Sequence, residues 1–438
     1  MDIKKWVKST FPKPVVNILR YFSRPYIRIY EWYLIKTQPL LHKKALARLK
    51  KKTGPINVVF FAIYESVWKY DALYKLLASD HRFNPIILVC PAINRGREHM
   101  IESLEACYEV FKQKGYNVIC SYDKTTGAYF SAQDLNPDII FYTNPYKGLI
   151  EDRYYVTHFR NVLTCFVNYA YNTSNFKFGC ALPFHNLMWT MFCEEDRIKQ
   201  MTASFSPLTK ARNCLVTGYP MYEIFLNNDI LDCRKWKING NELKRVIWAP
   251  HHTIEDATEG MIKFSSFLKY ADKMVEHATK YKSQIQFIFK PHPLLKVKLY
   301  DTPGWGKERT DRYYEWWENS DNTNFVNGEY EDIFKTSDAL IHDCGSFTVE
   351  YLYTRKPVMY LSEFDHCSQL NDVGIEAYNC HYIAANEGDI ENFLKEVVID
   401  GTDSLKQKRD YFYNQVLTPP NGRTASENIY EYLKSQIF

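Results

Sequence analysis

The sequence lacks any apolar run long enough to cross a membrane. No stretch of its 438 residues reaches the ~18 uninterrupted apolar residues that a spanning helix needs. An apolar signal-peptide core followed by small residues is also missing near the N-terminus. We therefore expect a chain that does not cross a membrane.

The sequence also lacks paired cysteines and an acidic metal motif. Its 11 cysteines are scattered without a C-x-x-C pair, whereas a disulfide framework shows paired cysteines on a short chain. This pattern indicates a reduced, cytosolic compartment. Metal binding by Cys344 beside His342 and Asp343 would need partner cysteines, and none lies nearby in the sequence. Because no D-x-D motif occurs, we expect no metal site and no tightly bound cofactor, with Mg²⁺ left as a possible companion of a phosphate substrate.

Positive charge is concentrated near the N-terminus. Residues 1–52 hold 14 lysines and arginines against Asp2 and Glu31, and the remaining chain is acidic overall. Aromatic and aliphatic residues are interleaved with these charges. Basic side chains contribute about 1 kcal/mol each near anionic headgroups, and aromatic rings settle at the interface. We expect residues 1–54 to be an arm that associates with an anionic membrane; packing on the protein's own surface is the second interpretation and nucleic-acid binding the third.

Residues 55–225 alternate between continuous apolar runs and helical patterns. Continuous runs are typical of parallel strands that helices cover on both faces. Trp68–Leu77 and Glu98–Lys114 have the spacing of such helices. The expected strands are Ile56–Ala62, Ile86–Cys90, Asn117–Cys120, Asp138–Tyr142, Leu163–Val167, Leu187–Cys193 and Cys214–Thr217. The sequence therefore predicts a doubly wound α/β domain over residues 55–225.

A second α/β series follows the polar residues 226–242, which we interpret as a linker. Its expected strands are Arg245–Ala249, Ile285–Phe289, Asn324–Val326, Ala339–His342 and Val358–Leu361. The length of the chain fits two or three domains. We therefore expect a second doubly wound domain over residues 243–438.

Three of these strands run into polar segments. The segment PHHT follows Ala249, KPHP follows Phe289, and DCGS follows His342. Ligands of open α/β sheets bind at the carboxyl ends of the strands, so we expect the three segments to meet. The third segment leads into a helical pattern at Phe347–Tyr353, whose first backbone N–H groups would be free to bind phosphate. The sequence thus predicts a diphosphate site.

In these segments the chain resembles the CDP-glycerol glycerophosphotransferases, the polymerases and primases of teichoic acids and related capsules. The resemblance rests on APHHT, FKPHP, SDALIHDCGSFTVEYLYTRKP and NGRTASE, in the family's order, and covers roughly residues 213–430. It implies the GT-B architecture, in which two Rossmann-type domains face a cleft. It also implies transfer of glycerol phosphate from CDP-glycerol to a lipid-linked or polymeric saccharide acceptor, at the inner leaflet of the bacterial cell membrane.

The resemblance assigns roles to matching positions. His292 is the expected catalytic, phosphate-contacting residue, and His252 is the favoured member of the adjacent histidine pair. The expected donor-binding residues are Thr253, Lys290, Asp343, Gly345, Ser346, Phe347 and Glu350. Structural alternatives stay open: a ring fixed in a rigid turn for His292, a helix cap for Asp343, and an exposed helix acid for Glu350.

Two features depart from the family's pattern. The family carries a W-H-G segment whose histidine is the expected base for the acceptor hydroxyl, and the corresponding residues 166–172 contain no histidine. His158, His185 and Tyr169 are the alternative bases. In addition, Cys344-Gly345 replaces an aromatic–serine pair, and glycine permits closer backbone approach to a phosphate.

These departures keep two other functions open. One is a glycosyltransferase of the same fold that uses a UDP- or CMP-sugar, because the altered turn could accept another nucleotide. The other is a non-catalytic assembly protein of the same pathway, because the expected base is missing. The favoured function remains glycerophosphate transfer by in-line attack of an acceptor hydroxyl on the β-phosphate, with CMP as the leaving group.

Overall fold

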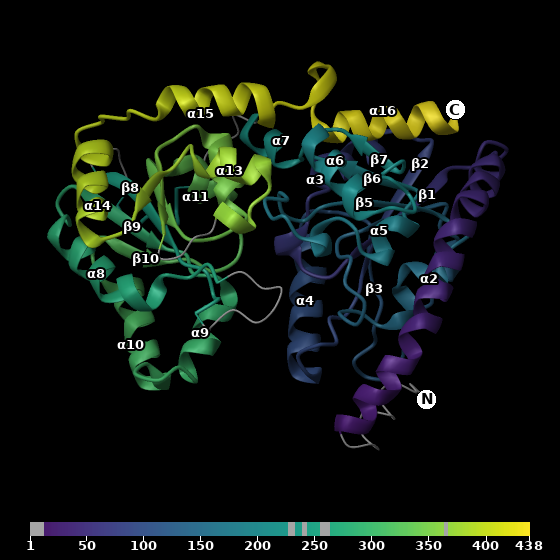
Figure 1. Cartoon of the computed structure of the whole chain (residues 1–438), viewed down its shortest axis with the longest axis horizontal. Helices are drawn as coiled ribbons and strands as arrows, with labels where there is room; N and C mark the ends of the chain where they lie inside the picture. Colours follow the sequence, from purple (N-terminus) through teal and green to yellow (C-terminus); the bar gives the residue numbers. More distant parts are fainter. Residues whose placement is uncertain (1–12, 227–232, 239–242, 255–262, 363–366) are drawn as a thin grey trace.

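Two parallel sheets form two halves that lie side by side (Figure 1). The computed structural model describes residues 13–226, 233–238, 243–254, 263–362 and 367–438. Every strand pair in both sheets is parallel, and helices cover the faces of each sheet. The predicted fold class, two doubly wound α/β sheets, is confirmed.

The first sheet has the strand order β3-β2-β1-β4-β5-β6-β7. Its strands are β1 (Ile56–Ala62), β2 (Phe83–Val89), β3 (Val118–Cys120), β4 (Ile139–Tyr142), β5 (Leu163–Val167), β6 (Thr190–Cys193) and β7 (Cys214–Val216), and its helices are α3 (Asp71–Ser79), α4 (Arg97–Gln113), α5 (Pro183–Leu187), α6 (Asp196–Phe205) and α7 (Met221–Leu226). Along β1, Phe60 belongs to the core on one face and Phe61 to the core on the other. The continuous apolar run therefore reflects burial on both faces. The strand expected from Leu187 begins only at Thr190, because Pro183 starts a short helix that ends at Leu187.

The second sheet has the order β10-β9-β8-β11-β12-β13. Its strands are β8 (Lys244–Ala249), β9 (Ile285–Phe289), β10 (Thr323–Phe325), β11 (Ala339–His342), β12 (Val358–Leu361) and β13 (Tyr382–Ala384), and its helices are α8 (Phe267–Lys280), α9 (Pro293–Tyr300), α10 (Gly306–Asn319), α11 (Glu331–Thr336), α12 (Phe347–Glu350), α13 (Asp372–Tyr378), α14 (Glu387–Asn392) and α15 (Lys406–Phe412). β8 lies between β9 and β11, where the strand order reverses. This switch point is where ligands of such sheets bind.

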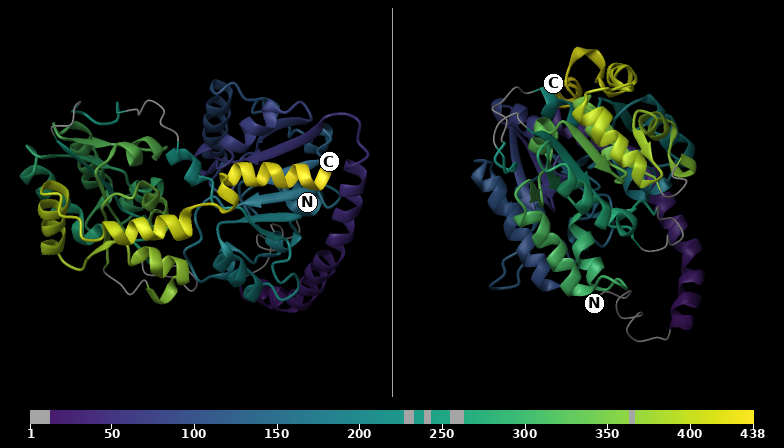
Figure 2. Two further views of the ribbon diagram at one scale, coloured as in Figure 1. Left: turned by 90° about the horizontal axis from the view of Figure 1, so that it is seen from above. Right: turned by 90° about the vertical axis from the view of Figure 1, so that its left-hand side faces the viewer.

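The C-terminal helix α16 (Ala425–Ile437) returns to the first half. Ile429, Leu433 and Ile437 join the core that covers one face of β1, and Figure 2 shows α16 over the first half while α15 lies over the second. The helix starts at a capping box in which the Thr424 side chain accepts from the backbone of Glu427 and the Glu427 side chain accepts in return. The division at residues 55–225 and 243–438 stays a prediction, and this last helix packs outside the half in which that division places it.

The expected linker lies partly outside the described residues, which omit 227–232 and 239–242. Its described part packs against the second half of the protein. Trp236 is buried in the core of the second half, and its indole Nε1 donates to Thr336 Oγ1 at 2.8 Å.

The N-terminal arm contains one long helix, α2 (Lys13–Leu49), along the outer side of the first half (Figure 1). Its later part packs on the protein, as in the second interpretation of the arm: Leu34, Ile35, Gln38, His42, Ala45 and Leu49 are buried at helical spacing. Residues 25–30, by contrast, are all exposed. No helix in the described part of the chain is both long and apolar enough to span a membrane.

The two halves are joined near the loop that follows β5. The backbone N–H of Asn371 donates to the carbonyl of Thr173 at 2.9 Å. A Cβ on Gly374 would lie 2.3 Å from the same carbonyl oxygen, so only glycine permits this approach. Arg197 Nη1 pairs with Glu376 Oε2 at 2.7 Å. These contacts fix how the two sheets face each other.

Candidate active site

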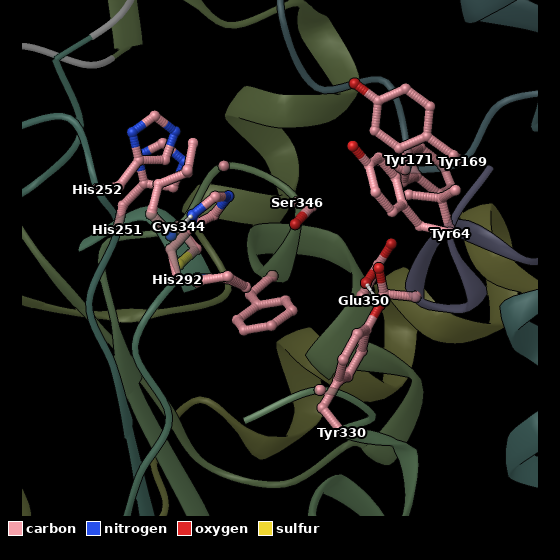
Figure 3. A pocket seen from close by; sticks show the side chains of 18 of the residues that line it. Tyr64, Tyr169, Tyr171, His251, His252, His292, Tyr330, Cys344, Ser346 and Glu350 are labelled. Atoms are coloured by element: carbon pink, nitrogen blue, oxygen red, sulfur yellow. Dashed lines mark hydrogen bonds between the residues drawn. The ribbon is translucent and has the colours of Figure 1, made fainter. Parts of the chain in front are cut away.

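A cleft of about 770 Å³ lies between the two halves. The second half lines it with residues that follow its strands: His251, His252, Lys290, Pro291, His292, Cys344, Gly345, Ser346, Phe347 and Glu350. The first half lines it with loop residues and one face of α4, including Tyr64, Glu65, Arg95, His99, Tyr146, Asn168, Tyr169 and Tyr171. Figure 3 shows the three histidines on one side of the cleft and Tyr64, Tyr169 and Tyr171 on the other.

The three strand-end segments meet as expected from the sequence. β8 pairs with β9 on one side and with β11 on the other. The segments after these strands therefore lie next to one another at the same edge of the sheet. His252, His292 and Ser346 all line the cleft, although the first and the last are 94 residues apart in the sequence.

His292 is held as a neutral hydrogen-bond donor. Its Nδ1 accepts the backbone N–H of Leu294 at 3.1 Å, which caps the first turn of α9. Because a backbone N–H can only donate, the proton of the neutral ring is on Nε2. Burial, with neighbouring positive groups, lowers the pKa of His292 to about 3. At neutral pH the ring can therefore offer Nε2–H to a phosphate oxygen, and the rigid-turn role and a binding role coexist.

His251, His252 and His292 form a compact cluster. Their ring centroids are 4.2 to 5.1 Å apart, and their nitrogens lie within 4.8 Å of one another, close enough to hold a metal ion. His251 Nδ1, however, is 2.9 Å from Thr253 Oγ1 and also accepts the Thr253 N–H. Since the Nδ1 atoms of His251 and His292 both accept backbone N–H groups, their remaining nitrogens carry protons. This arrangement suits an anion better than a cation.

Lys290 brings the positive charge of this wall. It follows β9 directly and is 6% exposed. Its Nζ lies 5.5 Å from the centre of the Tyr330 ring. Burial lowers the pKa of Lys290 to about 8, so the ammonium form still dominates at neutral pH. Among the residues that the structure describes, no carboxylate pairs with Lys290, and a buried ammonium in this state strongly attracts phosphate.

The turn after β11 supplies backbone donors. Within the described residues, the N–H groups of Gly345, Ser346 and Phe347 have no hydrogen-bond acceptor. A Cβ on Gly345 would lie 3.0 Å from the Phe264 ring, so a larger residue would require this ring to shift. The helix that follows is shorter than expected: α12 ends at Glu350, and Tyr351–Thr354 is a 3₁₀ turn.

Asp343 and Thr253 do not line the cleft, contrary to the expectation that they bind the donor. Asp343 is fully buried, and its carboxylate accepts the N–H groups of His251 at 2.5 Å and Ser266 at 2.6 Å. Thr253 Oγ1 accepts the N–H of Phe264 at 2.8 Å. Both side chains therefore hold the histidine segment in place from behind.

Glu350 lies at the cleft but is only 1% exposed. Tyr219 donates to its Oε1 at 3.2 Å, and Tyr330 donates to its Oε2 at 2.5 Å. Lys69, from the first half, donates to the Tyr330 hydroxyl at 3.1 Å. Burial raises the pKa of Glu350 while the charge of Lys69 opposes the shift. The alternative of an exposed helix acid is wrong, because Glu350 belongs to a buried network that connects the two halves.

The opposite wall is rich in tyrosine, and sequence reasoning found only its part within residues 166–172, including Tyr169. Tyr146 and Tyr169 have their hydroxyl oxygens 3.4 Å apart. Glu194 accepts from Asn168 Nδ2 at 3.0 Å and from the N–H of Asn172 at 3.3 Å, which holds the loop after β5. Burial raises the pKa of Glu194. No motif marks this wall, because its residues come from separate loops.

The three expected bases are distributed differently. His158 is exposed and pairs with Asp152 at 3.2 Å. His185 is buried, and its Nδ1 accepts the N–H of Leu182 at 3.0 Å. Neither lines the cleft, whereas Tyr169 does. Burial raises the pKa of Tyr169 far above neutral pH, so its phenol keeps its proton.

A comparison of the sequence with models of known protein families identifies the family of this chain. A model described as CDP-glycerol:poly(glycerophosphate) glycerophosphotransferase matches residues 192–435, more than half of the chain. The chain belongs to this family. The resemblance seen in its motifs is therefore confirmed, and this family member is a CDP-glycerol glycerophosphotransferase-type enzyme.

Solved structures share the fold. The wall teichoic acid polymerase TagF is 14% identical, with a TM-score of 0.53 over 96% of this chain and 98% of that chain. The UDP-N-acetylglucosamine 2-epimerase from Neisseria meningitidis bound to UDP-GlcNAc is 12% identical, with a TM-score of 0.52 over 87% of this chain and 100% of that chain. At these identities the likeness shows the GT-B fold alone. A search of curated proteins found no significant match.

Proposed function

We propose that this family member transfers glycerol phosphate from CDP-glycerol to a hydroxyl of a lipid-linked or polymeric saccharide in wall-polymer synthesis. The observation that carries the proposal is the meeting of His292, Lys290 and the Gly345–Phe347 turn at one wall of the cleft. A structure of TagF, which has the same fold, was obtained with CDPG soaked in. CDP-glycerol is therefore the donor that we assign to this wall.

The donor wall matches the charge that develops during the reaction. In-line attack on the β-phosphate releases CMP, whose phosphate gains negative charge as the bond breaks. Fixed donors stabilise such charge because they need no rearrangement in the transition state. In our assignment, Lys290 supplies the cation, His292 supplies Nε2–H, and Ser346 and Phe347 supply backbone N–H groups. His252 lies against His292, with ring centroids 4.2 Å apart, and would contact the same phosphates.

The opposite wall suits a saccharide. Tyr64, Tyr169 and Tyr171 face the histidines across the cleft (Figure 3). Tyrosine combines an apolar ring face with a hydroxyl group, which matches the apolar faces and hydroxyls of a sugar ring. The charged side chains on this wall include both a negative one, Glu65, and a positive one, Arg95. This mixed, aromatic wall supports a saccharide acceptor.

The exposed part of α2 supports a membrane-associated enzyme. Tyr26, Ile29, Tyr30, Trp32 and Tyr33 are each more than half exposed. Aromatic residues beside basic ones bind the interface of anionic bilayers. Deleting residues 1–33 removes this segment and leaves the buried residues from Leu34 onward. We expect the full chain to float with anionic liposomes and the deletion variant to lose most of that binding; undiminished flotation of the deletion variant would contradict this assignment.

CMP release tests the function directly. The protein is incubated with labelled CDP-glycerol and a lipid-linked saccharide, and CMP is quantified for the wild type, His292→Ala and His158→Ala. Loss of one preorganised donor costs about 10²–10³ in rate. We expect that loss for His292→Ala and nearly wild-type release for His158→Ala, which removes an exposed histidine outside the cleft. No CMP release by the wild type, or equal release by His292→Ala, would refute the proposal.

A further inference from the structure

The acceptor hydroxyl needs a proton acceptor on the first half of the cleft. A hydroxyl attacks phosphorus more readily when a positioned base takes its proton in the transition state. The position where the family carries a histidine, within residues 166–172, has none. His158 and His185 lie away from the cleft, and the phenol of Tyr169 stays protonated. Glu65 supplies a carboxylate and His99 an imidazole on this wall.

Helix α4 presents one face to the cleft. Arg95, just before the helix, and His99, Ser103 and Ala106 all line the cleft. The spacing of four and three residues places His99, Ser103 and Ala106 on one side of this helix. Figure 1 shows α4 on the side of the first half that faces α9, the helix that His292 caps.

His292 lines the same cleft from the second half. Burial is the main cause of the lowered pKa of His292, and the charge of Arg95 contributes to it. Burial raises the pKa of Tyr64 on the tyrosine wall, and the charge of Arg95 opposes this shift. His99 lines the cleft together with Arg95 and Tyr64, on the side of the first half.

His99 has no structural task that would explain a histidine. Within the described ranges its side chain forms no hydrogen bond, and its Nδ1 is buried without a partner. His185 and His292, by contrast, each accept a backbone N–H that fixes the ring. The ring of His99 is half-buried in the cleft wall. Because Nδ1 is the covered nitrogen, the role of proton acceptor falls to Nε2, with the ring proton on Nδ1.

We propose that His99 is the general base that deprotonates the acceptor. This inference rests on the proposed function. The acceptor O–H bond breaks and its proton moves to Nε2 of His99, while the oxygen forms a bond to the β-phosphorus of CDP-glycerol. The bond between that phosphorus and the bridging oxygen breaks, and CMP leaves with the electron pair. The proton then passes from His99 to water, which restores the base.

The test compares His99→Ala with Glu102→Ala, which shortens an exposed side chain of α4 that does not line the cleft. A positioned base contributes about 10²–10⁴ in rate. We expect His99→Ala to lower kcat for CMP release by about 100-fold or more, with the KM for CDP-glycerol changed by less than about threefold. Imidazole added to His99→Ala should restore part of the rate, and Glu102→Ala should stay within about twofold of the wild type.

Three results would overturn the assignment. The first is a kcat for His99→Ala within about threefold of the wild type. The second is a loss of CMP affinity as large as the loss of kcat, which would make His99 a donor-binding residue. The third is a rate loss confined to Glu65→Gln, the carboxylate variant on the same wall. Equal thermal unfolding of the variants and the wild type shows that each folds. Failure of the wild type to release CMP would instead refute the proposed function.

Discussion

The two walls of the cleft are built in different ways. The donor wall comes from three neighbouring strand ends, and its side chains are fixed by buried hydrogen bonds, such as those of His292 to Leu294 and of Asp343 to His251. The acceptor wall comes from separate loops and one helix face, and it is mostly aromatic. A diphosphate needs charges at fixed positions, whereas a sugar ring is held by broad, adaptable surfaces. The construction of each wall follows from the ligand that we assign to it.

Replacing Lys290 should have the largest effect. Lys290→Met keeps much of the volume but removes the buried cation of the donor wall. We expect kcat for CMP release to fall by about 10²–10³. Lys296→Met, on α9 but outside the residues that line the cleft, should change kcat by less than about twofold. A small effect of Lys290→Met would show that the donor wall does not depend on this charge.

Replacing Asp343 tests how firmly the donor wall must be held. The two carboxylate oxygens of Asp343 accept the N–H groups of His251 and Ser266. Asp343→Asn replaces one of these oxygens with an NH₂ group, which cannot accept a hydrogen bond from a backbone N–H. We expect the free energy of unfolding to fall by about 1–3 kcal/mol, measured in urea, together with weaker CMP binding because the His251 segment shifts. Asp372→Asn, an exposed acid on α13, is the control. Unchanged stability of Asp343→Asn would argue against this positioning role.

Replacing Tyr169 should weaken binding of the acceptor and leave binding of the donor unchanged. Tyr169→Ala removes a ring from the aromatic wall, and such contacts contribute about 0.5–1.5 kcal/mol. We expect the KM for the saccharide to rise by about 2- to 10-fold while the KM for CDP-glycerol stays the same. Tyr169→Phe keeps the ring and should behave nearly as the wild type. A change in donor KM would break the division between the two walls.

The smallest expected effect is a pH dependence of CMP affinity that arises from the donor wall. Lys290 has a pKa of about 8 and binds phosphate in its charged form, so CMP affinity should weaken as the pH rises through 8. The pKa of His292 is about 3, so this ring stays neutral and adds no step between pH 5 and 7. Calorimetric titration of CMP from pH 6 to 9 measures this. Lys290→Met should show no weakening near pH 8; an equal dependence in that variant would assign it to another group.

The sequence was sufficient to predict both sheets, except for the edge strand β13, and the meeting of the three segments. Buried parallel strands have continuous apolar runs, and their carboxyl ends share one edge, so His252, His292 and Ser346 could be placed together. The direction of each side chain could not be predicted. Asp343 and Thr253 have the residue types of ligands, yet their positions in the turns direct them to backbone N–H groups behind the cleft.

Other features depend on packing over long distances. An amphipathic pattern predicts a helix at α16 but does not say which sheet the helix covers, and Ile429 and Leu433 pack on the first one. The acceptor wall joins loops more than 70 residues apart, such as those of Tyr64 and Tyr169. His99 sits in an ordinary helical pattern, and only its place in the fold distinguishes it.

The most direct test is a crystal structure of the protein with CMP bound. We predict that the phosphate lies at the ends of β8, β9 and β11, within hydrogen-bonding distance, about 3 Å, of Lys290 Nζ, the His292 ring and the N–H of Ser346. A phosphate bound to the tyrosine wall or outside the cleft would contradict the assignment of the donor wall.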